Sequence, residues 1–133
     1  MADRTDGFEQ AEAKFEHIKD ALARLDAARE AKDWGVEEDV ADEMLDMALF
    51  VEVRSGWTVT SEPLKREEYC ILLVSGGPAV RIVGDLNEDR EPEPVSASLE
   101  YQDWFTPWYE YIPEEDEGKA LLIRFAQFFY YGG

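Results

Sequence analysis

Histidine and cysteine, the residues that most often act as catalytic bases and nucleophiles, each occur once, as His17 and Cys70. Lys14 rather than a glutamate stands three residues before His17, so the Glu-x-x-His pattern of di-iron sites is absent. No nucleophile-elbow motif accompanies His17. Cys70 lies in the apolar segment EYCILLV, where a small buried side chain is expected. A single cysteine also excludes an internal disulfide.

Two further segments are superficially similar to ligand-binding loops. The segment SGGPAVRIVG, residues 75–84, lacks the Gly-Lys-Ser/Thr ending of a phosphate loop and leads into a predicted strand, so it indicates a turn. The segment GDLNEDREPEPV, residues 84–95, lacks the central glycine and alternating ligands of a calcium loop. Among 31 acidic residues, no spacing selects a carboxylate pair for glycoside chemistry. We therefore predict a protein that is not an enzyme, with no cofactor and no metal.

The charge of the chain is its most unusual property. Its 133 residues include 31 acidic and 13 basic residues, a formal net charge of −18. Such a field repels nucleic acid and anionic membranes and attracts basic protein surfaces. The polar, acidic start MADRTDGFEQ is not a secretory signal, and no apolar run approaches the ~20 residues of a membrane span. We expect a cytoplasmic protein that contacts neither membrane nor nucleic acid directly.

The acidic residues are concentrated in two blocks. Residues 30–52 carry nine acidic residues and one basic, and residues 85–117 carry twelve and one. One interpretation is a solvated surface that promotes solubility or adapts the protein to high salt. The other is a binding surface for a basic partner. Duplex DNA presents one negative charge per ~1.7 Å of axis, and carboxylates along a helix and an adjoining sheet can imitate that array.

Two helices are predicted at the start of the chain. Apolar residues at spacings of three and four form a helical stripe whose start is capped by Thr5 or Asp6 and whose end precedes Gly35. The stripe consists of Phe8, Ala11, Phe15, Ile18, Leu22 and Leu25. The segment VEEDVADEMLDMALF predicts a second helix with the stripe Val36, Val40, Met44 and Met47. The short connection between them favours antiparallel packing.

The apolar period then changes to two, which predicts strands. The predicted strands are FVEVRSGWTVT, EYCILLVS, AVRIVGDL and ASLEYQDWF, and residues 87–96 are a predicted loop. Pro113 is expected to open a last helix that buries Leu121, Leu122, Phe125, Phe128 and Phe129. The order predicts a single α+β domain over 1–133: an acidic helical part, 1–50, then an antiparallel sheet of about four strands and a C-terminal helix, 51–133.

The stretch YQDWFTPWYEY, residues 101–111, contains six aromatic residues beside a carboxylate rim. Trp104 and Phe105 are expected to close the core, and the aromatic residues after Pro107 are expected to face a partner. The predicted partner-binding residues of both blocks are Glu37, Glu38, Asp39, Asp42, Glu43, Asp46, Glu100, Asp103, Trp108, Tyr109, Glu110, Tyr111, Glu114, Glu115, Asp116 and Glu117.

Four segments, EVRSGW, GGPAVRIVGDL, LEYQDWFTPW and LLIRFAQFFYYGG, together resemble a group of small uncharacterised acidic proteins of prophages and other bacterial mobile elements. The resemblance covers residues 51–133 and implies a mobile-element context, with no catalytic residue to carry over. In overall character alone, the chain is similar to antirestriction and anti-CRISPR inhibitors that mimic DNA. The leading hypothesis is therefore an inhibitor that binds a basic nucleic-acid-binding surface of a host defence protein. The alternative is a phage or mobile-element structural or assembly protein that binds through apolar and aromatic surface.

Overall fold

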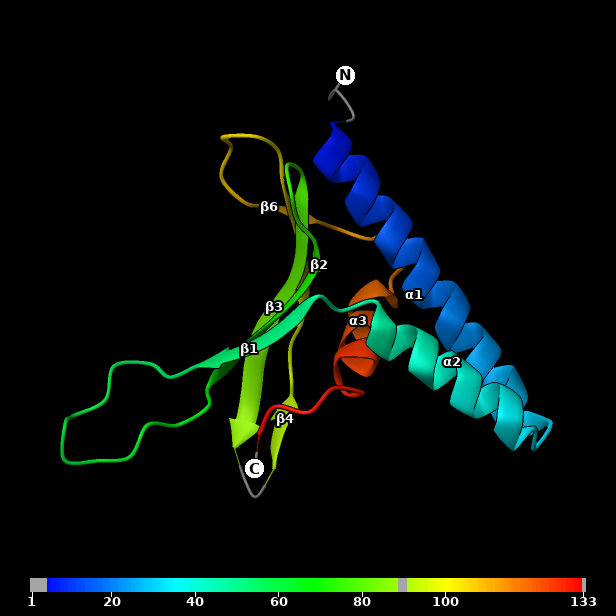
Figure 1. Ribbon diagram of the computed structural model, residues 1–133, viewed down its shortest axis with the longest axis horizontal. Helices are drawn as coiled ribbons and strands as arrows, with labels where there is room; N and C mark the ends of the chain where they lie inside the picture. Colours follow the sequence, from blue (N-terminus) through cyan, green and yellow to red (C-terminus); the bar gives the residue numbers. More distant parts are fainter. Residues whose placement is uncertain (1–4, 89–90, 133) are drawn as a thin grey trace.

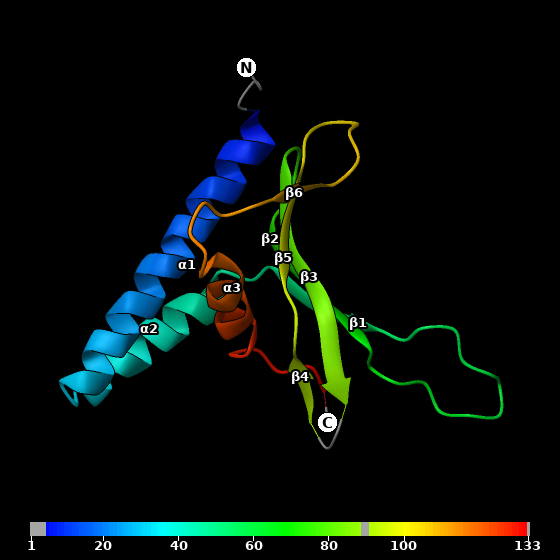
Figure 2. The same cartoon turned by 180° about the vertical axis from the view of Figure 1, so that it is seen from behind.

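The computed structural model describes residues 5–88 and 91–132. Three helices lie on one face of an antiparallel sheet with the strand order β1-β2-β3-β5-β6, and β4 pairs with the far end of β3 (Figures 1 and 2). In chain order the elements are α1 (Asp6–Glu30), α2 (Trp34–Asp46), β1 (Phe50–Arg54), β2 (Glu68–Val74), β3 (Ala79–Glu88), β4 (Pro92–Pro94), β5 (Ser98–Gln102), β6 (Tyr109–Tyr111) and α3 (Gly118–Ala126). The predicted α+β class is confirmed, but the sheet has six strands among these described residues rather than about four. The difference arises because β4 and β6, each three residues long, leave almost no periodic signal.

The first helix follows the sequence closely. Thr5 is the N-cap of α1 and accepts a hydrogen bond from the Phe8 amide at 3.2 Å. Five residues of the predicted stripe are buried, and Phe8 packs against the core they form. The helix ends before Lys32, which has a positive φ of 57°, and Asp33 caps α2. Gly35 therefore lies inside α2 rather than at the end of α1.

The second helix packs antiparallel to α1 through Val40, Met44 and Met47, as its stripe predicted. Val36 is the exception, because 44% of its surface is exposed. No helix among residues 5–88 and 91–132 combines the length and the apolar character that crossing a bilayer requires.

The sheet separates a buried face from an open face. Tyr69, Ile71 and Leu73 on β2 point toward the helices, where they join one core with Val80, Ile82 and Leu99 and with side chains of α1 and α3. Glu68, Cys70 and Leu72 alternate with them and point to the open face. Cys70 was predicted to be a small buried side chain, but it lies on the open face and is only half-buried.

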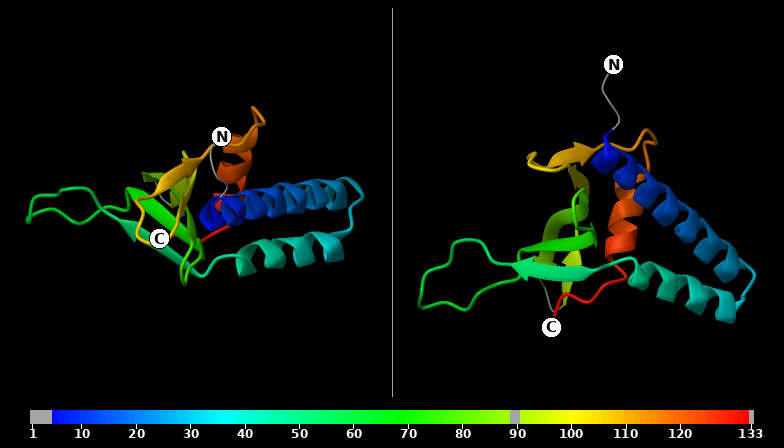
Figure 3. Two further views of the ribbon diagram at one scale, coloured as in Figure 1. Left: turned by 90° about the horizontal axis from the view of Figure 1, so that it is seen from above. Right: turned by 45° about the horizontal axis from the view of Figure 1, so that its top comes forward.

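The first predicted strand, 50–60, is shorter in the structure. β1 ends at Arg54, which pairs with Glu68, and residues 55–67 form a long loop that projects away from the sheet (Figure 3). Local contacts hold the base of this loop, since the Gly56 amide donates to the Glu67 carboxylate at 2.8 Å. Of the predicted loop 87–96, residues 92–94 form β4, and residues 89 and 90 lie outside the described residues.

The last helix begins later than predicted. Residues 113–117 form turns, and α3 starts at Gly118. Pro113 is buried so close to Gly118 that a Cβ on that glycine would lie 2.3 Å from the proline Cβ. Leu122 and Phe125 are fully buried as predicted, whereas Leu121, Phe128 and Phe129 are only partly buried. Gly133, at the end of the predicted helix, lies outside the described residues.

The aromatic stretch is arranged differently from the prediction. Trp104 and Phe105 do not close the core: their side chains are 66% and 100% exposed, in a loop that follows β5. Tyr111 was predicted to face a partner, but it is buried, with its ring centroid 5.5 Å from that of Phe8 and 6.0 Å from that of Phe15. The core is thus closed by the last aromatic residue of the stretch.

Candidate acidic interaction surfaces

Two of the six predicted carboxylates on α2 serve the packing of α2 on α1. Glu37 accepts a hydrogen bond from Arg29 at 2.8 Å. Glu43 accepts hydrogen bonds from Arg24 and lies 2.9 Å from the His17 imidazole. Bonding to Arg24 first, and to His17 second, lowers the pKa of Glu43 to about 2. These two carboxylates are compensated within the protein.

The other four carboxylates form what we call the α2 acidic stripe: Glu38, Asp39, Asp42 and Asp46. None of them makes an ion pair or a side-chain hydrogen bond with the described residues, and all four are exposed. At 3.6 residues per turn, they lie within roughly 100° of the helix circumference and over roughly 12 Å of its length. Asp39, Asp42 and Asp46 also line a shallow groove of about 510 Å³ between α1 and α2.

The α2 acidic stripe is unfavourable for the helix that carries it. Asp42 and Asp46 lie near the C-terminus of α2, where the helix dipole favours cations, and the last turn contains no basic residue. Glu38 and Asp42, and Asp42 and Asp46, are like-charged pairs at a spacing of four. Each effect is worth a few tenths of a kcal/mol to about 1 kcal/mol. The stripe therefore contributes nothing favourable to folding that the structure shows.

The second predicted block is divided among several places. Glu100 binds Arg81 at 2.8 Å, and the Trp108 ring lies against the same guanidinium, 3.9 Å from its centroid. Glu110 pairs with Lys119, which lowers the pKa of Glu110. Asp103 accepts a hydrogen bond from the Gly7 amide at 2.8 Å. These side chains are committed to contacts inside the protein.

The rest of the second block lies near the C-terminal end of the aromatic stretch and in the turn that follows it. Tyr109 is 47% exposed and stacks on Tyr101 at 5.8 Å between centroids. Within the turn 113–117, Glu115 binds Lys19 on α1 at 2.7 Å. Glu114, Asp116 and Glu117 are exposed and make no ion pair with the described residues. The structure therefore does not bring the two acidic blocks together as one continuous surface.

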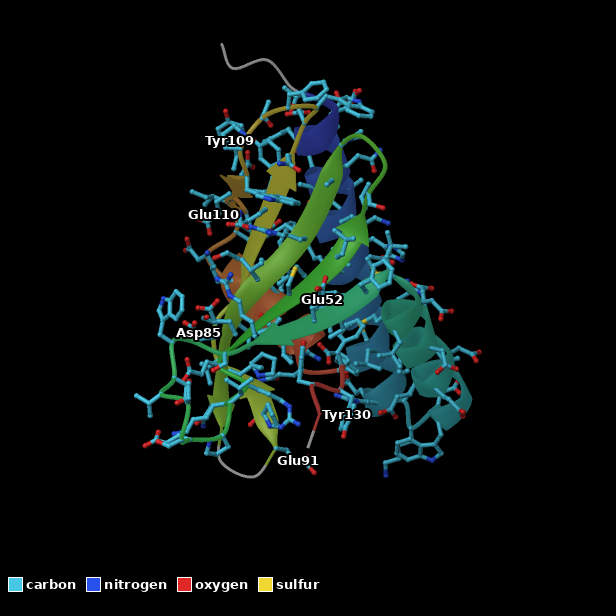
Figure 4. All side chains as sticks on the ribbon, turned by 60° about the vertical axis from the view of Figure 1, so that its left-hand side comes forward. Glu52, Asp85, Glu91, Tyr109, Glu110 and Tyr130 are labelled. Atoms are coloured by element: carbon cyan, nitrogen blue, oxygen red, sulfur yellow. The ribbon has the colours of Figure 1, made fainter. Side chains whose placement is uncertain are left out.

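The open face of the sheet contains a polar hollow that the sequence analysis did not identify. It has a volume of about 520 Å³ and is formed by β1, β2, β3 and β5. Figure 4 views the sheet from its open face, with Glu52 and Asp85 of this lining labelled. Charged side chains dominate its lining: Glu52, Arg54, Glu68, Arg81, Asp85 and Glu100. Arg54 pairs with Glu68, and Arg81 pairs with Glu100. Charged residues at every second position of the predicted strands were the signal that could have revealed this face.

The hollow contains Cys70 but not His17. Cys70 is part of its lining, and burial raises the pKa of the thiol, which disfavours the nucleophilic thiolate. His17, the one histidine, is far from it on α1 and bonded to Glu43. In the part of the chain that the structure describes, no three His, Cys, Asp or Glu side chains are placed to hold a metal ion.

Comparisons with protein-family models, with curated proteins and with solved structures find no match for this chain.

Proposed function

We propose that this protein is a non-enzymatic inhibitor that occupies a basic, nucleic-acid-binding surface of a host defence protein with its α2 acidic stripe. One observation supports the proposal above the others: four carboxylates on one side of α2 lack a basic partner among the described residues, although α1 neutralises the two beside them. Charges that weaken their own helix are expected where a function outside folding requires them.

The spacing of the α2 acidic stripe suits mimicry of a nucleic acid. Its four charges over roughly 12 Å correspond to one charge per ~4 Å, close to the ~3.4 Å per charge along one strand of duplex DNA. A basic groove that attracts DNA would attract this helix by the same field and at a high association rate. The mobile-element context implied by the resemblance supports a defence protein as the target.

The test begins with the partner and then isolates the stripe. Proteins captured from bacterial lysate on the immobilised chain are identified, and the purified partner is titrated with the protein in the presence and absence of duplex DNA. A mimic competes with DNA for the same surface. A capture that yields no nucleic-acid-binding protein, or a partner that binds DNA and this protein together, would contradict mimicry.

A matched pair of triple variants then tests the location of the contact. The stripe variant loses three negative charges through Asp39→Asn, Asp42→Asn and Asp46→Asn. The control variant loses three exposed negative charges elsewhere, through Glu62→Gln, Glu91→Gln and Glu93→Gln, so both variants change the net charge of −18 by the same amount. We expect the stripe variant to bind about tenfold or more weakly, with a shallower salt dependence, and the control variant to bind normally. Equal losses in the two variants would show that only net charge matters.

A second candidate function is assembly through apolar surface, because two aromatic residues are fully exposed. Trp57 projects in the loop 55–67, and Phe105 projects in the loop after β5. Exposed aromatic residues of this kind are common anchors of protein interfaces. Salt distinguishes the two functions: an assembly contact through these rings persists as ionic strength rises, whereas a mimic complex dissociates.

A further inference from the structure

The strand β1 is an uncovered edge of the sheet. Within residues 5–88 and 91–132 it pairs with β2 alone, and all five of its residues are exposed. Val51 and Val53 lie opposite Ile71 and Tyr69, on the face that the helices cover elsewhere, yet they are 36% and 40% exposed. A sheet edge with exposed apolar side chains is a template for another strand.

The opposite edge of the sheet differs. There, β6 has three residues, one of which, Glu110, is charged and paired with Lys119. Short, charged edges of this kind resist further pairing. The five-residue β1 is longer and exposes Phe50, Val51 and Val53. Its two charged residues, Glu52 and Arg54, have opposite signs, so a second copy of the strand can pair with them. In the figures the helices lie beside the central strands, and β1 emerges past them (Figures 1 and 3).

We propose that β1 pairs antiparallel with β1 of a second copy of this chain, across a twofold axis perpendicular to the sheet at Val53. The proposal is independent of the proposed inhibitory function. A twofold axis in this direction keeps the helices of the two copies on the same side of one continuous sheet, and each residue faces a residue on the same side of the sheet.

Charge complementarity selects the register. Centred on Val53, the pairing places Glu52 of each copy opposite Arg54 of the other. The Arg54 guanidinium, which binds Glu68 within its own copy, then also meets a carboxylate of the partner, once on each side of the axis. Centred on Glu52, it would place two glutamates against each other. Centred on Val51, it would place each glutamate opposite Phe50 and bring the ends of the two α2 helices toward the axis.

The Val53 register also covers the exposed apolar residues that flank β1. The chain after Arg54 continues beside the start of the partner strand, so that Trp57 comes opposite Leu49 and Gly56 comes opposite Phe50. Trp57 is fully exposed in one copy, and Leu49 and Phe50 are 51% and 65% exposed. Gly56 has no side chain to obstruct the Phe50 ring. One register therefore satisfies both the charges and the apolar residues.

A charge-swap series measured by sedimentation equilibrium tests the dimer. Over a concentration series of the full chain we expect a monomer–dimer equilibrium that persists at raised salt, because salt screens the repulsion between two acidic copies. Glu52→Arg and Arg54→Glu, each alone, place like charges opposite each other and should weaken the dimer about tenfold or more. The double variant restores opposite charges and should restore the dimer. Circular dichroism of each variant confirms that it is folded.

Disulfide trapping tests the register. In a Cys70→Ser background, Val53→Cys places two thiols at the twofold axis, where facing Cα atoms of paired strands lie about 4.5 to 5.5 Å apart, within disulfide reach. We expect rapid oxidation to a covalent dimer. Val51→Cys, the matched control, faces Ser55 of the partner and should not crosslink. A chain that is monomeric at every concentration, or that crosslinks through Val51→Cys and not through Val53→Cys, would overturn the proposal.

Discussion

Glu43 on α2 accepts hydrogen bonds from both terminal nitrogens of the Arg24 guanidinium on α1, and the Nε of the same guanidinium donates to Asp20, one turn earlier on α1. The Arg24 side chain is 42% exposed and that of Glu43 is 36% exposed, so solvent screens the attraction. This contact still orients α2, because it joins the two helices at the middle of their interface. Because of this ion pair, Glu43 is neutralised within the protein, unlike the four carboxylates of the α2 acidic stripe.

The bond between Arg24 and Glu43 predicts a specific dependence of stability on pH. The pKa of Glu43 is about 2 in the folded protein, below its ordinary value of 4.5. Between these values the unfolded chain binds more protons, so the stabilisation is complete above about pH 4.5 and is lost as the pH falls toward 2. We expect the difference in unfolding free energy between wild type and Glu43→Gln to decrease from about pH 5 to about pH 2. Urea denaturation at several pH values measures it.

Arg24→Gln is the control for that experiment. Without the guanidinium, the largest cause of the lowered pKa is removed, and His17 alone remains beside the carboxylate. The effect of Glu43→Gln in the Arg24→Gln background should therefore depend less on pH. A pH profile that is the same in both backgrounds would show that Arg24 does not lower the pKa of Glu43.

Removing the negative charge of Asp46 should stabilise the protein. It lies at the C-terminus of α2, where its charge opposes the helix dipole and repels Asp42. Asp46→Asn should raise the free energy of unfolding by about 0.5 kcal/mol and Asp46→Lys by about 1 kcal/mol. Asp39→Asn, in the middle of the helix, should have little effect. Thermal unfolding measures all three, and a loss of stability in Asp46→Asn would show that the carboxylate has a role in the fold.

The elements best predicted from the sequence are those stabilised by a long apolar repeat. The 25-residue α1 needs only its own stripe and cap to be recognised, and β2 and β3 alternate clearly. The end of β5 depends instead on a distant contact: Asp103 bonds to the Gly7 amide, 96 residues away in sequence. That bond takes Asp103 out of the strand, so the strand alternation predicted for Trp104 and Phe105 does not apply.

The candidate surface was predictable to a similar degree. A helical period places Glu38, Asp39, Asp42 and Asp46 on one side of α2 without any knowledge of the fold. The pairing of Glu37 and Glu43 depends on how α1 packs against α2, which no local pattern specifies. The burial of Tyr111 likewise depends on Phe8 and Phe15, which belong to the first helix at the other end of the chain. Side chains whose partners are distant in sequence are the ones that sequence patterns misplace.

Adding a side chain at Gly84 on β3 should greatly lower the stability of the protein. A Cβ at this position would lie 2.1 Å from the Ser96 carbonyl oxygen, which accepts a hydrogen bond from the Tyr69 hydroxyl at 2.6 Å, and 2.8 Å from the Tyr69 ring. Backbone and a buried ring cannot both move, so Gly84→Ala should cost about 3 kcal/mol.

Gly35 is the matched control for Gly84. A Cβ there meets only the Asp33 carboxylate, at 3.7 Å, in the first turn of α2. Gly35→Ala should therefore stabilise the protein by about 0.5 kcal/mol, because alanine favours the helix. Urea denaturation distinguishes the two substitutions. Equal effects at the two positions would show that the Ser96 carbonyl does not constrain β3.

Phe105 combines an unfavourable backbone conformation with complete exposure. Its φ is 62°, in the left-handed region, and its ring is 100% exposed. The loop holds this conformation through Thr106, whose hydroxyl accepts from the Asp103 amide at 3.0 Å and whose carbonyl accepts from the Gln102 side chain at 2.8 Å. A bulky residue in this region costs about 1 kcal/mol or more.

Glycine at position 105 should therefore stabilise the fold. Phe105→Gly relieves the strain and should raise the free energy of unfolding by about 0.5 to 1 kcal/mol, since part of the gain is lost to the flexibility of glycine in the unfolded chain. Phe105→Ala keeps the unfavourable φ and removes the ring, so its stability should match wild type. If the ring is an interface anchor, both variants should bind a partner equally weakly. A Phe105→Gly protein no more stable than Phe105→Ala would show that the loop stores no strain.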